Sequence, residues 1–403
     1  MRLLHTSDWH LGQHFMGKTR QAEHQAFCAW LIDQVREQAV DALLIAGDVF
    51  DTGAPPSYAR EQYNRFIVDL RATGCELVVL GGNHDSVAML GESKTLLAQL
   101  GSRVIPGVCA SMEEQVLVLH RRDGAPGAIL CAIPFIRPRE VLQSQAGQSA
   151  EDKQLSLQQA IQQHYLELFA LAEAKRDQLG GELPIIASGH LTTVGASASD
   201  SVREIYVGSL EAFPTSAFPP AAYIALGHIH RPQKVGGLEH IRYCGSPIAL
   251  SFDEAKQQKE VLLVDLDRSG LSAVTALPVP CFQPLLSLRG TLKELEQAIA
   301  MAAAQGRPEQ PVWLEVQVAT DDYLSDLHVR IAALCEGLPV EVLRIRRERG
   351  AAALSLSRQT RETLDELSPD DVFARRLASE ALDEALQERL RALYRDTLAQ
   401  LRD

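Results

Sequence analysis

The run Ala42-Leu43-Leu44-Ile45-Ala46 is apolar from end to end and stops abruptly at Gly47-Asp48. Four other short apolar runs end in the same way, at a glycine or small polar residue followed by a side chain that can bind a metal ion. They are Leu3–Ser7 before Asp8-Trp9-His10, Leu77–Leu80 before Gly81-Gly82-Asn83-His84-Asp85, Ile185–Ser188 before Gly189-His190, and Tyr223–Leu226 before Gly227-His228-Ile229-His230. Short apolar runs bounded by turn residues are typical of buried strands. Five such endings predict strand ends that converge on a metal centre.

The elements between these runs indicate an α/β layered domain. Stretches with helical character separate the strand-like runs, at Ala22–Ala39, Ser57–Thr73, Ser93–Leu100 and Asp152–Leu179. Such alternation is typical of layered α/β folds. Later runs have the spacing of an antiparallel set, at Val116–His120, Ala128–Ile133 and Val261–Asp267. We therefore predict a mixed rather than a purely parallel arrangement of strands.

The length of 403 residues predicts two or three domains. The strand-and-ligand pattern predicts a first domain over residues 1–277. After Pro278-Val279-Pro280, residues 282–347 alternate strand and helix without any glycine-ligand ending, which predicts a small α+β module of accessory role. Its expected strands are Pro284–Leu288, Val312–Val318 and Val340–Ile345, and its expected helices are Thr291–Ala303 and Ser325–Cys335.

The last part of the chain, residues 354–403, is predicted to form one or two helices after a linker at Gly350-Ala351-Ala352-Ala353. Ser368-Pro369-Asp370-Asp371 has the composition of a helix start. An apolar stripe at helical spacing follows, consisting of Leu382, Leu386, Leu390, Leu393, Tyr394, Leu398 and Leu401. Two interpretations stay open, because this stripe can pack on the chain's own core or dock onto a partner helix.

Composition excludes some classes of protein and leaves others open. No stretch of about 20 apolar residues is present, so no membrane span is predicted. Met1–His5 leads directly into the first predicted strand, which favours a cytoplasmic protein without a signal peptide. The seven cysteines form no CxxC pair, so neither a disulfide framework nor a zinc ribbon is expected. The net charge of −13 does not decide for or against nucleic acid, because bound divalent cations and a partner subunit can offset it.

The residues at the strand ends form a candidate ligand set without any thiolate: Asp8, His10, Asp48, Asn83, His190, His228 and His230. Oxygen and imidazole donors suit Mn²⁺, Mg²⁺, Fe or Zn²⁺ in a hydrolytic site. Seven ligands exceed what one such ion uses when positions must stay open, and they fit two ions that share a carboxylate. Two-metal sites serve phosphoester hydrolysis. Glycine before most of the ligands lets the backbone turn sharply off the strand. A single ending of this kind is more often an ordinary turn, and the other histidines, among them His5 and His14, are expected to be surface or core residues.

One stretch offers a competing interpretation. Gly12-Gln13-His14-Phe15-Met16-Gly17-Lys18-Thr19 matches the P-loop pattern GxxxxGK[ST], which would indicate an ATPase. A P-loop must leave the first strand directly and open a helix. Here Asp8-Trp9-His10 intervenes, and Phe15 and Met16 are bulky for a loop that wraps phosphates. We therefore predict that this stretch does not bind a nucleotide.

The order Asp-x-His, Gly-Asp, Gly-Asn-His-Asp, Gly-His and Gly-His-x-His resembles that of the calcineurin-like metallophosphoesterases. The wider context resembles the SbcD family, the nuclease subunits of bacterial SbcCD DNA-repair complexes. It does so at residues 4–12 and 46–53, at Gly189–Ala196 and at Tyr243-Cys244-Gly245-Ser246-Pro247, and the similarity extends over essentially the whole chain. The implied fold is a metallophosphoesterase β-sandwich flanked by helices, with a small capping domain and C-terminal helices.

The resemblance also implies roles for single residues. Asp8, His10 and His230 would hold one ion, and Asn83, His190 and His228 the other, with Asp48 bridging them. Of the suitable ions we expect Mn²⁺. His84 would not bind metal but would face the scissile phosphate and donate a proton or stabilise the transition state. Asp51 stands where some relatives carry histidine, and we hypothesise that it orients His84. Tyr243–Pro247 is assigned no chemistry.

The implied function is that of a two-metal DNA nuclease in repair, replication and recombination. It would be an ATP-dependent 3′→5′ exonuclease on double strands and an endonuclease on single strands and hairpins. The implied partners are DNA, the ATPase subunit SbcC, whose coiled coil the C-terminal helices would contact, and a second copy of the chain. Two other functions stay open: a small-molecule or cyclic-nucleotide phosphodiesterase, which the C-terminal extension disfavours, and a non-catalytic scaffold, which the presence of His84 disfavours.

Overall fold

The computed structural model describes residues 1–142, 150–199, 201–202, 212–319, 327–347, 373, 377 and 387–394. The chain divides into two compact units. The first consists of Met1–Ser287, Ala302–Glu315 and Pro339–Leu343, and the second contains the described parts of Leu288–Met301, Val316–Leu338 and Arg344–Asp403.

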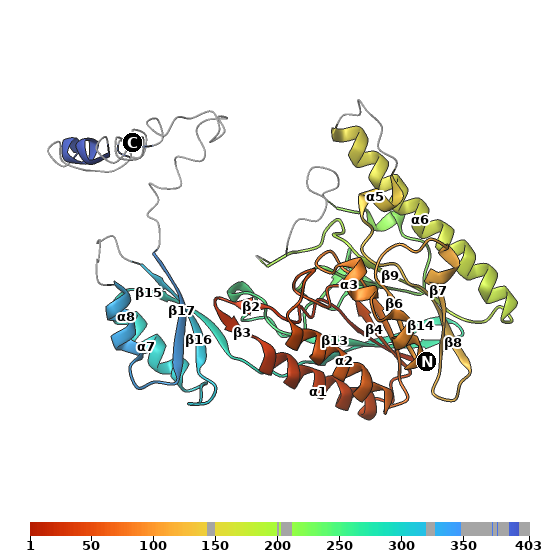
Figure 1. The fold of residues 1–403 in the computed structure, drawn as a ribbon, viewed down its shortest axis with the longest axis horizontal. Helices are drawn as coiled ribbons and strands as arrows, with labels where there is room; N and C mark the ends of the chain where they lie inside the picture. The colour runs from red at the N-terminus through yellow and green to blue at the C-terminus, as the bar shows by residue number, and fades with distance from the viewer. Residues whose placement is uncertain are drawn as a thin grey trace. The chain divides into compact units, whose positions relative to one another are not determined.

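Two six-stranded sheets form the framework of the first unit (Figure 1). The first sheet has the order β14-β13-β1-β4-β5-β6, with β1 (Arg2–Thr6), β4 (Ala42–Ala46), β5 (Glu76–Leu80), β6 (Ser102–Ile105), β13 (Glu260–Asp267) and β14 (Gly270–Pro278). Its strands β1, β4, β5 and β6 are parallel, whereas β13 runs antiparallel to β1. The second sheet has the order β11-β12-β10-β9-β8-β7, with β7 (Val116–His120), β8 (Pro126–Cys131), β9 (Ile185–His190), β10 (Tyr223–Gly227), β11 (Gln233–Val235) and β12 (Leu238–Tyr243). Here β8, β9, β10 and β12 are parallel, and β7 and β11 are antiparallel at the edges.

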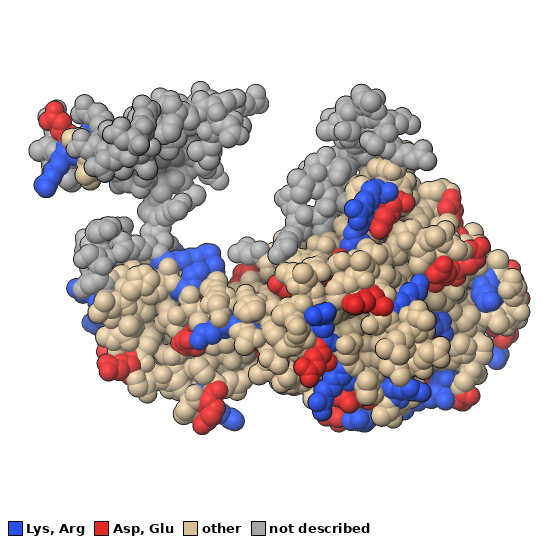
Figure 2. All heavy atoms as spheres, in the orientation of Figure 1, with Lys and Arg blue, Asp and Glu red and all other residues tan. Residues whose placement is uncertain are grey.

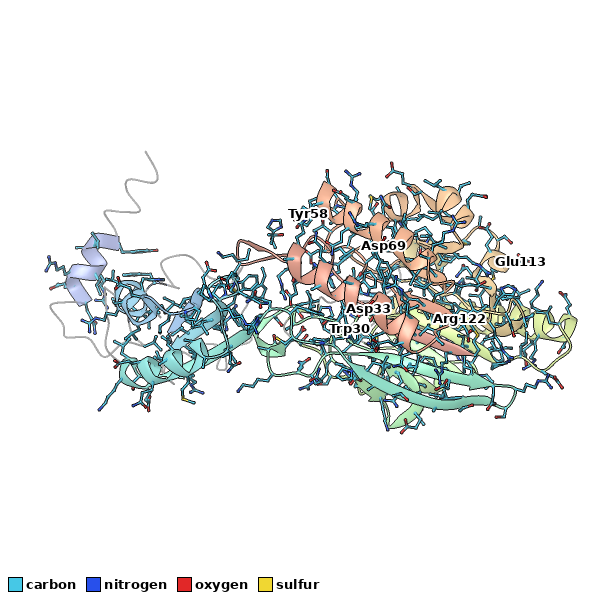
Figure 3. The ribbon with its side chains drawn as sticks, turned by 90° about the horizontal axis from the view of Figure 1, so that it is seen from below. Trp30, Asp33, Tyr58, Asp69, Glu113 and Arg122 are labelled. Atoms are coloured by element: carbon cyan, nitrogen blue, oxygen red, sulfur yellow. The ribbon has the colours of Figure 1, made fainter. Side chains whose placement is uncertain are left out.

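The sheets pack face to face, and helices cover their outer faces. In β4, Leu44 belongs to the core between the sheets, while Leu43 and Ile45 belong to the core under the helices. This alternation is the period of two expected of a strand with both faces buried. Figure 3 shows α1 (Gln21–Glu37), which carries Trp30 and Asp33, beside α2 (Ser57–Arg71), which carries Tyr58 and Asp69. On the other side, α6 (Ala150–Gln178) packs on β8 and β9. The predicted mixed, layered α/β fold is confirmed.

Shorter elements complete the first unit. They are α3 (Val87–Gly91), α4 (Lys94–Gln99), α5 (Pro138–Val141), and three 3₁₀ turns, η1 (Met112–Gln115), η2 (Thr215–Ala217) and η3 (Phe252–Glu254). The stretch with the P-loop pattern forms a hairpin of β2 (His14–Phe15) and β3 (Lys18–Thr19), in which His14 pairs with Thr19. A paired hairpin does not present the row of free backbone N–H groups that cradles phosphates. The structure thus supports the prediction that this stretch is not a nucleotide-binding loop.

The small α+β pattern is also present. β15 (Leu285–Gly290), β16 (Val312–Val318) and β17 (Val340–Arg347) form a three-stranded sheet in that order, with α7 (Leu292–Ala303) and α8 (Leu327–Cys335) between them in sequence. The division between the two units falls within these strands rather than before residue 282. The three-domain division at 277, 282–347 and 354–403 therefore stays a prediction.

Most of the predicted tail lies outside the described residues. This holds for the linker, for Ser368–Asp371, and for Leu382, Leu386, Leu398 and Leu401 of the apolar stripe. Residues 387–394, which include Leu390, Leu393 and Tyr394, are helical.

Three further observations concern the composition of the described chain. Within the described ranges, no helix is both long and apolar enough to span a bilayer. The seven cysteines are free thiols, as expected from their spacing. Figure 2 shows lysine and arginine side chains interspersed with aspartate and glutamate on the visible face of the described residues.

The inner face of β1 carries a histidine that makes the fold sensitive to acid. His5 is fully buried, its Nδ1 lies 3.0 Å from the hydroxyl of Tyr223, and burial lowers its pKa from 6.5 to about 3. Below pH 6.5 the unfolded chain binds a proton here that the folded chain does not. Stability is therefore complete above pH 6.5 and falls as the pH falls toward 3, by about 2 kcal/mol at pH 5 from this one residue.

Urea unfolding of the metal-free protein in EDTA, at pH 7.5 and pH 5, tests this expectation. His5→Asn should reduce the loss of unfolding free energy between the two pH values by about 2 kcal/mol, whatever its effect at pH 7.5. His14→Asn, at an exposed position, is the control and should leave the pH dependence as in the wild type. An unchanged pH dependence in His5→Asn would contradict the assignment.

Candidate metal centre

Strand ends from both sheets bring the predicted residues together. Asp8 and His10 follow β1, Asp48 follows β4, and Asn83 and His84 follow β5, which are three adjacent strands of the first sheet. His190 ends β9, and His228 and His230 follow β10, which are neighbours in the second sheet, where Gly227 pairs with His190. In parallel strands the carboxyl ends share one edge, where open α/β sheets place their ligands. The predicted convergence of five strand ends is confirmed.

The glycines before the ligands act in two different ways. Gly47 has φ +95°, which agrees with the predicted sharp turn. Gly82 instead lies against Asp48 in the neighbouring loop of the same sheet, and Gly227 lies where the two sheets approach each other. A Cβ on Gly82 would lie 2.1 Å from Asp48 Oδ1, and one on Gly227 would lie 2.0 Å from the carbonyl oxygen of Ala46. These two glycines are therefore needed for close approach of the backbone and not for turning.

Four ligand candidates occupy the left-handed region of the backbone. The φ angles are +55° at Asp8, +50° at His10, +50° at Asp48 and +95° at His228. Non-glycine residues adopt such angles at a cost of about 1–3 kcal/mol each, and they concentrate at functional sites. The surrounding strands hold the strained residues in place.

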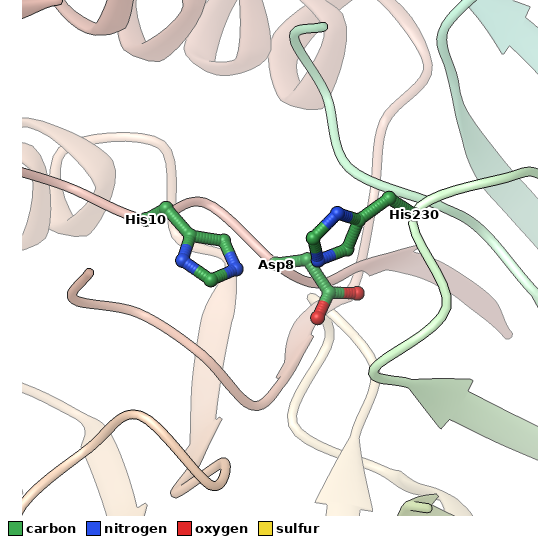
Figure 4. Close-up of side chains that lie close together, drawn as sticks. All are labelled: Asp8, His10 and His230. Carbon is green, nitrogen blue, oxygen red and sulfur yellow. The ribbon is translucent and has the colours of Figure 1, made fainter. Parts of the chain in front are cut away.

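The first group of donors consists of Asp8, His10 and His230, whose ligand atoms lie within 4.8 Å of one another (Figure 4). His10 Nδ1 lies 3.1 Å from Asp51 Oδ1, so this nitrogen donates to the carboxylate. Its other nitrogen, Nε2, is buried without a hydrogen-bond partner among the described atoms. A buried unpaired ring nitrogen is costly, and a metal ion between the three side chains would satisfy it.

The second group consists of Asp48, His190 and His228, again within 4.8 Å, together with Asn83. His190 Nδ1 donates to the carbonyl of Ala46 at 2.9 Å. Its Nε2 then faces two oxygens that can only accept, Asn83 Oδ1 at 2.9 Å and Asp48 Oδ2 at 3.2 Å. His228 Nδ1 lies 3.1 Å from the same Asn83 oxygen. Lone pairs that converge in this way fit a cation.

Electrostatics support the same interpretation. Burial by itself raises the pKa of the Asp48 carboxyl, but His190 and His10 beside it hold that pKa well below its usual range. Burial lowers the pKa of His190, yet the charge of Asp48 outweighs it and raises the pKa to about 9. In the absence of metal the carboxylate of Asp48 thus favours positive charge on His190, whereas burial and the charge of His190 hold the pKa of His228 well below its usual range.

His84 lies beside the first group. Its ring centroid is 4.6 Å from that of His10, and its backbone N–H donates to Asp48 Oδ1 at 2.8 Å. Its Nδ1 donates to the backbone carbonyl of Asp51 at 2.8 Å. The predicted role of His84 would therefore fall to its second ring nitrogen, Nε2. His10, Asp48 and His84 also bring ligand atoms within 4.8 Å of one another, so the geometry alone does not separate His84 from the ligands.

Asp51 contacts both His10 and His84, and the hypothesis that it orients His84 stays a prediction. Its carboxylate contacts the ligand candidate His10, whereas its contact with His84 is made by the backbone carbonyl. The side chain therefore holds His10, and the hydrogen bond of His84 to the Asp51 carbonyl is one that a substitution at position 51 would retain. The catalytic role of Asp51 stays a prediction.

The chain that carries this geometry is similar to known proteins. Residues 1–232 match the calcineurin-like phosphoesterase family. The SbcD nuclease component of SbcCD from Escherichia coli K12 is 54% identical over 399 residues, which cover 99% of this chain and 98% of that protein. The chain belongs to this family of nuclease subunits. The family's Rhodobacter capsulatus member is 34% identical over 85% of this chain and 86% of its own, and its Bacillus subtilis member is 29% identical over 81% of each.

A second family match covers the end of the SbcD-type chain. Residues 281–381 match the family described as type 5 capsule protein repressor C-terminal domain. This match begins close to Pro278-Val279-Pro280, after which the sequence alternates strand and helix without glycine-ligand endings.

One buried carboxylate of this SbcD-family site has a role that the sequence pattern does not indicate. Asp85 accepts hydrogen bonds from the backbone N–H groups of Gly82, Val49 and Phe50, at 2.9, 3.1 and 3.0 Å. It therefore ties the loop after β4 to the loop after β5, which carry Asp48 and Asn83. Burial, with the nearby charge of Asp48, raises the pKa of Asp85 to about 6. In the sequence, the only indication of this role is an aspartate two residues after the predicted ligand Asn83. Such an aspartate could equally be a metal ligand or a residue that holds two loops together.

Proposed function

We propose that this chain is the nuclease subunit of an SbcCD-type complex and hydrolyses phosphodiester bonds in DNA with two Mn²⁺ ions. Family membership supports the nuclease activity. The observation that carries the two-ion site is the pair of donor groups described above, which Asp48 of the second group links because its Oδ2 lies 3.7 Å from Nε2 of His10 in the first group. Each group contains imidazole nitrogens that face acceptors or lack a partner.

In this proposal Asp8, His10 and His230 would hold one ion, Asn83, His190 and His228 would hold the other, and both would share Asp48. When bound, the ions would clamp the phosphate, activate the attacking water and stabilise the charge that develops on the phosphoryl oxygens. The protein supplies the fixed geometry. Asp51 holds His10 by its Nδ1 proton, and the carbonyl of Ala46 holds His190 in the same way.

His84 is the proposed proton donor or transition-state stabiliser. The carbonyl of Asp51 fixes the Nδ1 proton of His84, and the backbone N–H of His84 is anchored on Asp48. With Nδ1 held in this way, Nε2 would be the atom that acts on the substrate.

The cellular location, the partners and the cleavage pattern that we propose are those implied by membership of the SbcD family. The protein would act in the cytoplasm with SbcC as ATPase, in a complex that contains two nuclease subunits. It would degrade double strands from 3′ to 5′ in an ATP-dependent manner and cut hairpins and single strands, during repair, replication and recombination. The α+β module would shape the DNA-binding surface, and the C-terminal helices would contact SbcC.

Cleavage of a labelled DNA hairpin by the purified chain, with Mn²⁺ and with or without SbcC, tests the proposal. We expect cleavage that stops when EDTA removes the metal and resumes when Mn²⁺ is restored. A generic phosphodiester, bis-p-nitrophenyl phosphate, is assayed in parallel. Cleavage of this ester alone would favour a small-molecule phosphodiesterase, and cleavage of neither substrate would favour a scaffold. Either outcome would overturn the proposal.

A further inference from the structure

A buried ion pair lies next to the proposed metal centre and is not used by any step above. Glu254, at the end of η3, is completely buried, and Lys259, before β13, has only 6% of its surface exposed. Lys259 Nζ lies 2.6 Å from Glu254 Oε2. A buried ion pair adds little to stability compared with apolar side chains of the same size. Its presence therefore calls for a second reason.

The two oxygens of Glu254 face different partners. Oε1 accepts from the hydroxyl of Ser199 at 2.7 Å and from that of Ser201, and it lies 3.3 Å from Nδ1 of His230. The Ser201 hydroxyl oxygen lies 2.6 Å from the same Nδ1, so it links the ring to Glu254 as well. Oε2 accepts from Lys259 and from the backbone N–H of Leu250 at 3.1 Å. The carboxylate is thus fixed on one side and directed at the His230 ring on the other.

Lys259 reaches the same histidine from its backbone side. Its ammonium group donates to the carbonyl oxygen of His230 at 3.0 Å and to the hydroxyl of Ser246 at 3.0 Å. The backbone N–H of Ser246 donates to that carbonyl at 3.2 Å, and the Ser246 hydroxyl lies 3.2 Å from Glu254 Oε2. Both the ring and the main chain of His230 are therefore held by one connected network.

These contacts give a role to the Tyr243–Pro247 segment, to which the sequence pattern assigns no chemistry. Gly245 has φ +76°, and a Cβ there would lie 2.7 Å from the carbonyl oxygen of His230. The segment therefore packs directly on the main chain of His230 and places Ser246 between Glu254 and Lys259. The turn η3 is anchored as well, because Phe252 packs with Phe15 and Trp313 in an apolar cluster.

We propose that Glu254 and Lys259 are a positioning pair that fixes the tautomer, ring orientation and backbone of His230, so that its Nε2 is presented to the ion shared with Asp8 and His10. A carboxylate that accepts the Nδ1 proton leaves the lone pair on Nε2. Such partners typically contribute 10–100-fold to metal affinity. The inference rests on the proposed two-ion function, and it concerns one of the two ions.

Metal binding by Glu254→Gln tests the proposal without any substrate. Isothermal titration with Mn²⁺ should show one site weakened about 10–100-fold and the other retained. Electron paramagnetic resonance at intermediate Mn²⁺ should accordingly show isolated ions where the wild type shows a coupled pair. Glu23→Gln is the matched control, because Glu23 is also buried and lies 2.5 Å from a buried Arg20 but contacts no ligand candidate. It should bind both ions as the wild type does.

A second variant separates positioning from folding. Replacing Glu254 and Lys259 together by methionine removes both buried charges and is expected to preserve the fold. The double variant should still lose Mn²⁺ affinity at one site. It provides the test if Glu254→Gln does not fold. Wild-type affinity at both sites in either variant would overturn the positioning role while leaving the nuclease proposal intact. Failure of the wild-type protein to bind two ions would instead overturn the proposed function itself.

Discussion

Substitution of His84 by alanine is expected to leave both Mn²⁺ ions bound and to reduce the single-turnover rate of hairpin cleavage about 10²–10⁴-fold, the usual contribution of a positioned acid or base. The reason is the division of contacts around the ring. The backbone N–H that anchors the residue on Asp48 survives the substitution, whereas the Nε2 atom is lost. The ligand contacts of His10 and His190 are not made through His84.

The measurement combines metal titration with single-turnover cleavage at saturating Mn²⁺. His10→Ala is the matched control, because it removes an adjacent imidazole that is a proposed ligand, and it should lose metal together with activity. The close grouping of His84 with His10 and Asp48 supplies the rival interpretation. Loss of one ion in His84→Ala, with activity restored by excess Mn²⁺, would make His84 a ligand and refute its role as proton donor.

The strand endings could predict the candidate centre because each is recognisable in a few consecutive residues, and because the end of a strand determines where the next side chains lie in the sheet. A parallel strand must deliver its next residues to the same sheet edge as its neighbours, so the Gly-Asp after Ala46 and the Gly-Gly-Asn after Leu80 could be placed together without knowledge of the packing. The helices and strands of residues 282–347 were predictable for the same local reason, and they begin and end within a few residues of the expected positions.

The supporting network could not be predicted, because nothing local marks it. Glu254 acts on His230 from 24 positions further along the chain, and it lies in a short turn with no ligand pattern around it. The contact between the Asp51 carboxylate and His10 was likewise not indicated by the sequence, while the expected role of Asp51 in orienting His84 stays a prediction. The sharp-turn role assigned to the glycines agrees with the φ angle of Gly47 and was incomplete for Gly82 and Gly227, because the close approach of a neighbouring loop or of the other sheet is a tertiary property.

Asp48→Asn is expected to remove both ions from the centre, in contrast to the other ligand substitutions. Asp48 is the only carboxylate shared by two of the donor groups in the described chain, and its Oδ2 lies 3.2 Å from His190 Nε2 and 3.7 Å from His10 Nε2. Asparagine preserves the size and the oxygen that accepts from the N–H of His84, but it removes the charge that both ions would share. Cleavage should therefore fall at least about 10³-fold, since metal ions supply several kcal/mol of transition-state stabilisation.

Thermal unfolding gives a readout of this loss that does not depend on activity. A ligand at 100 times its dissociation constant stabilises the folded state by about 2.7 kcal/mol for each site. Wild-type protein should therefore unfold at a higher temperature with Mn²⁺ than with EDTA, and Asp48→Asn should show no such difference. Asp85→Asn is the matched control, because this buried carboxylate binds only backbone N–H groups of the same two loops in the contacts described above. It should lower the unfolding temperature in EDTA but retain the increase with Mn²⁺. An Asp48→Asn protein that Mn²⁺ still stabilises to the wild-type extent would show that the ions do not depend on a shared carboxylate, and the two-ion assignment would have to be abandoned.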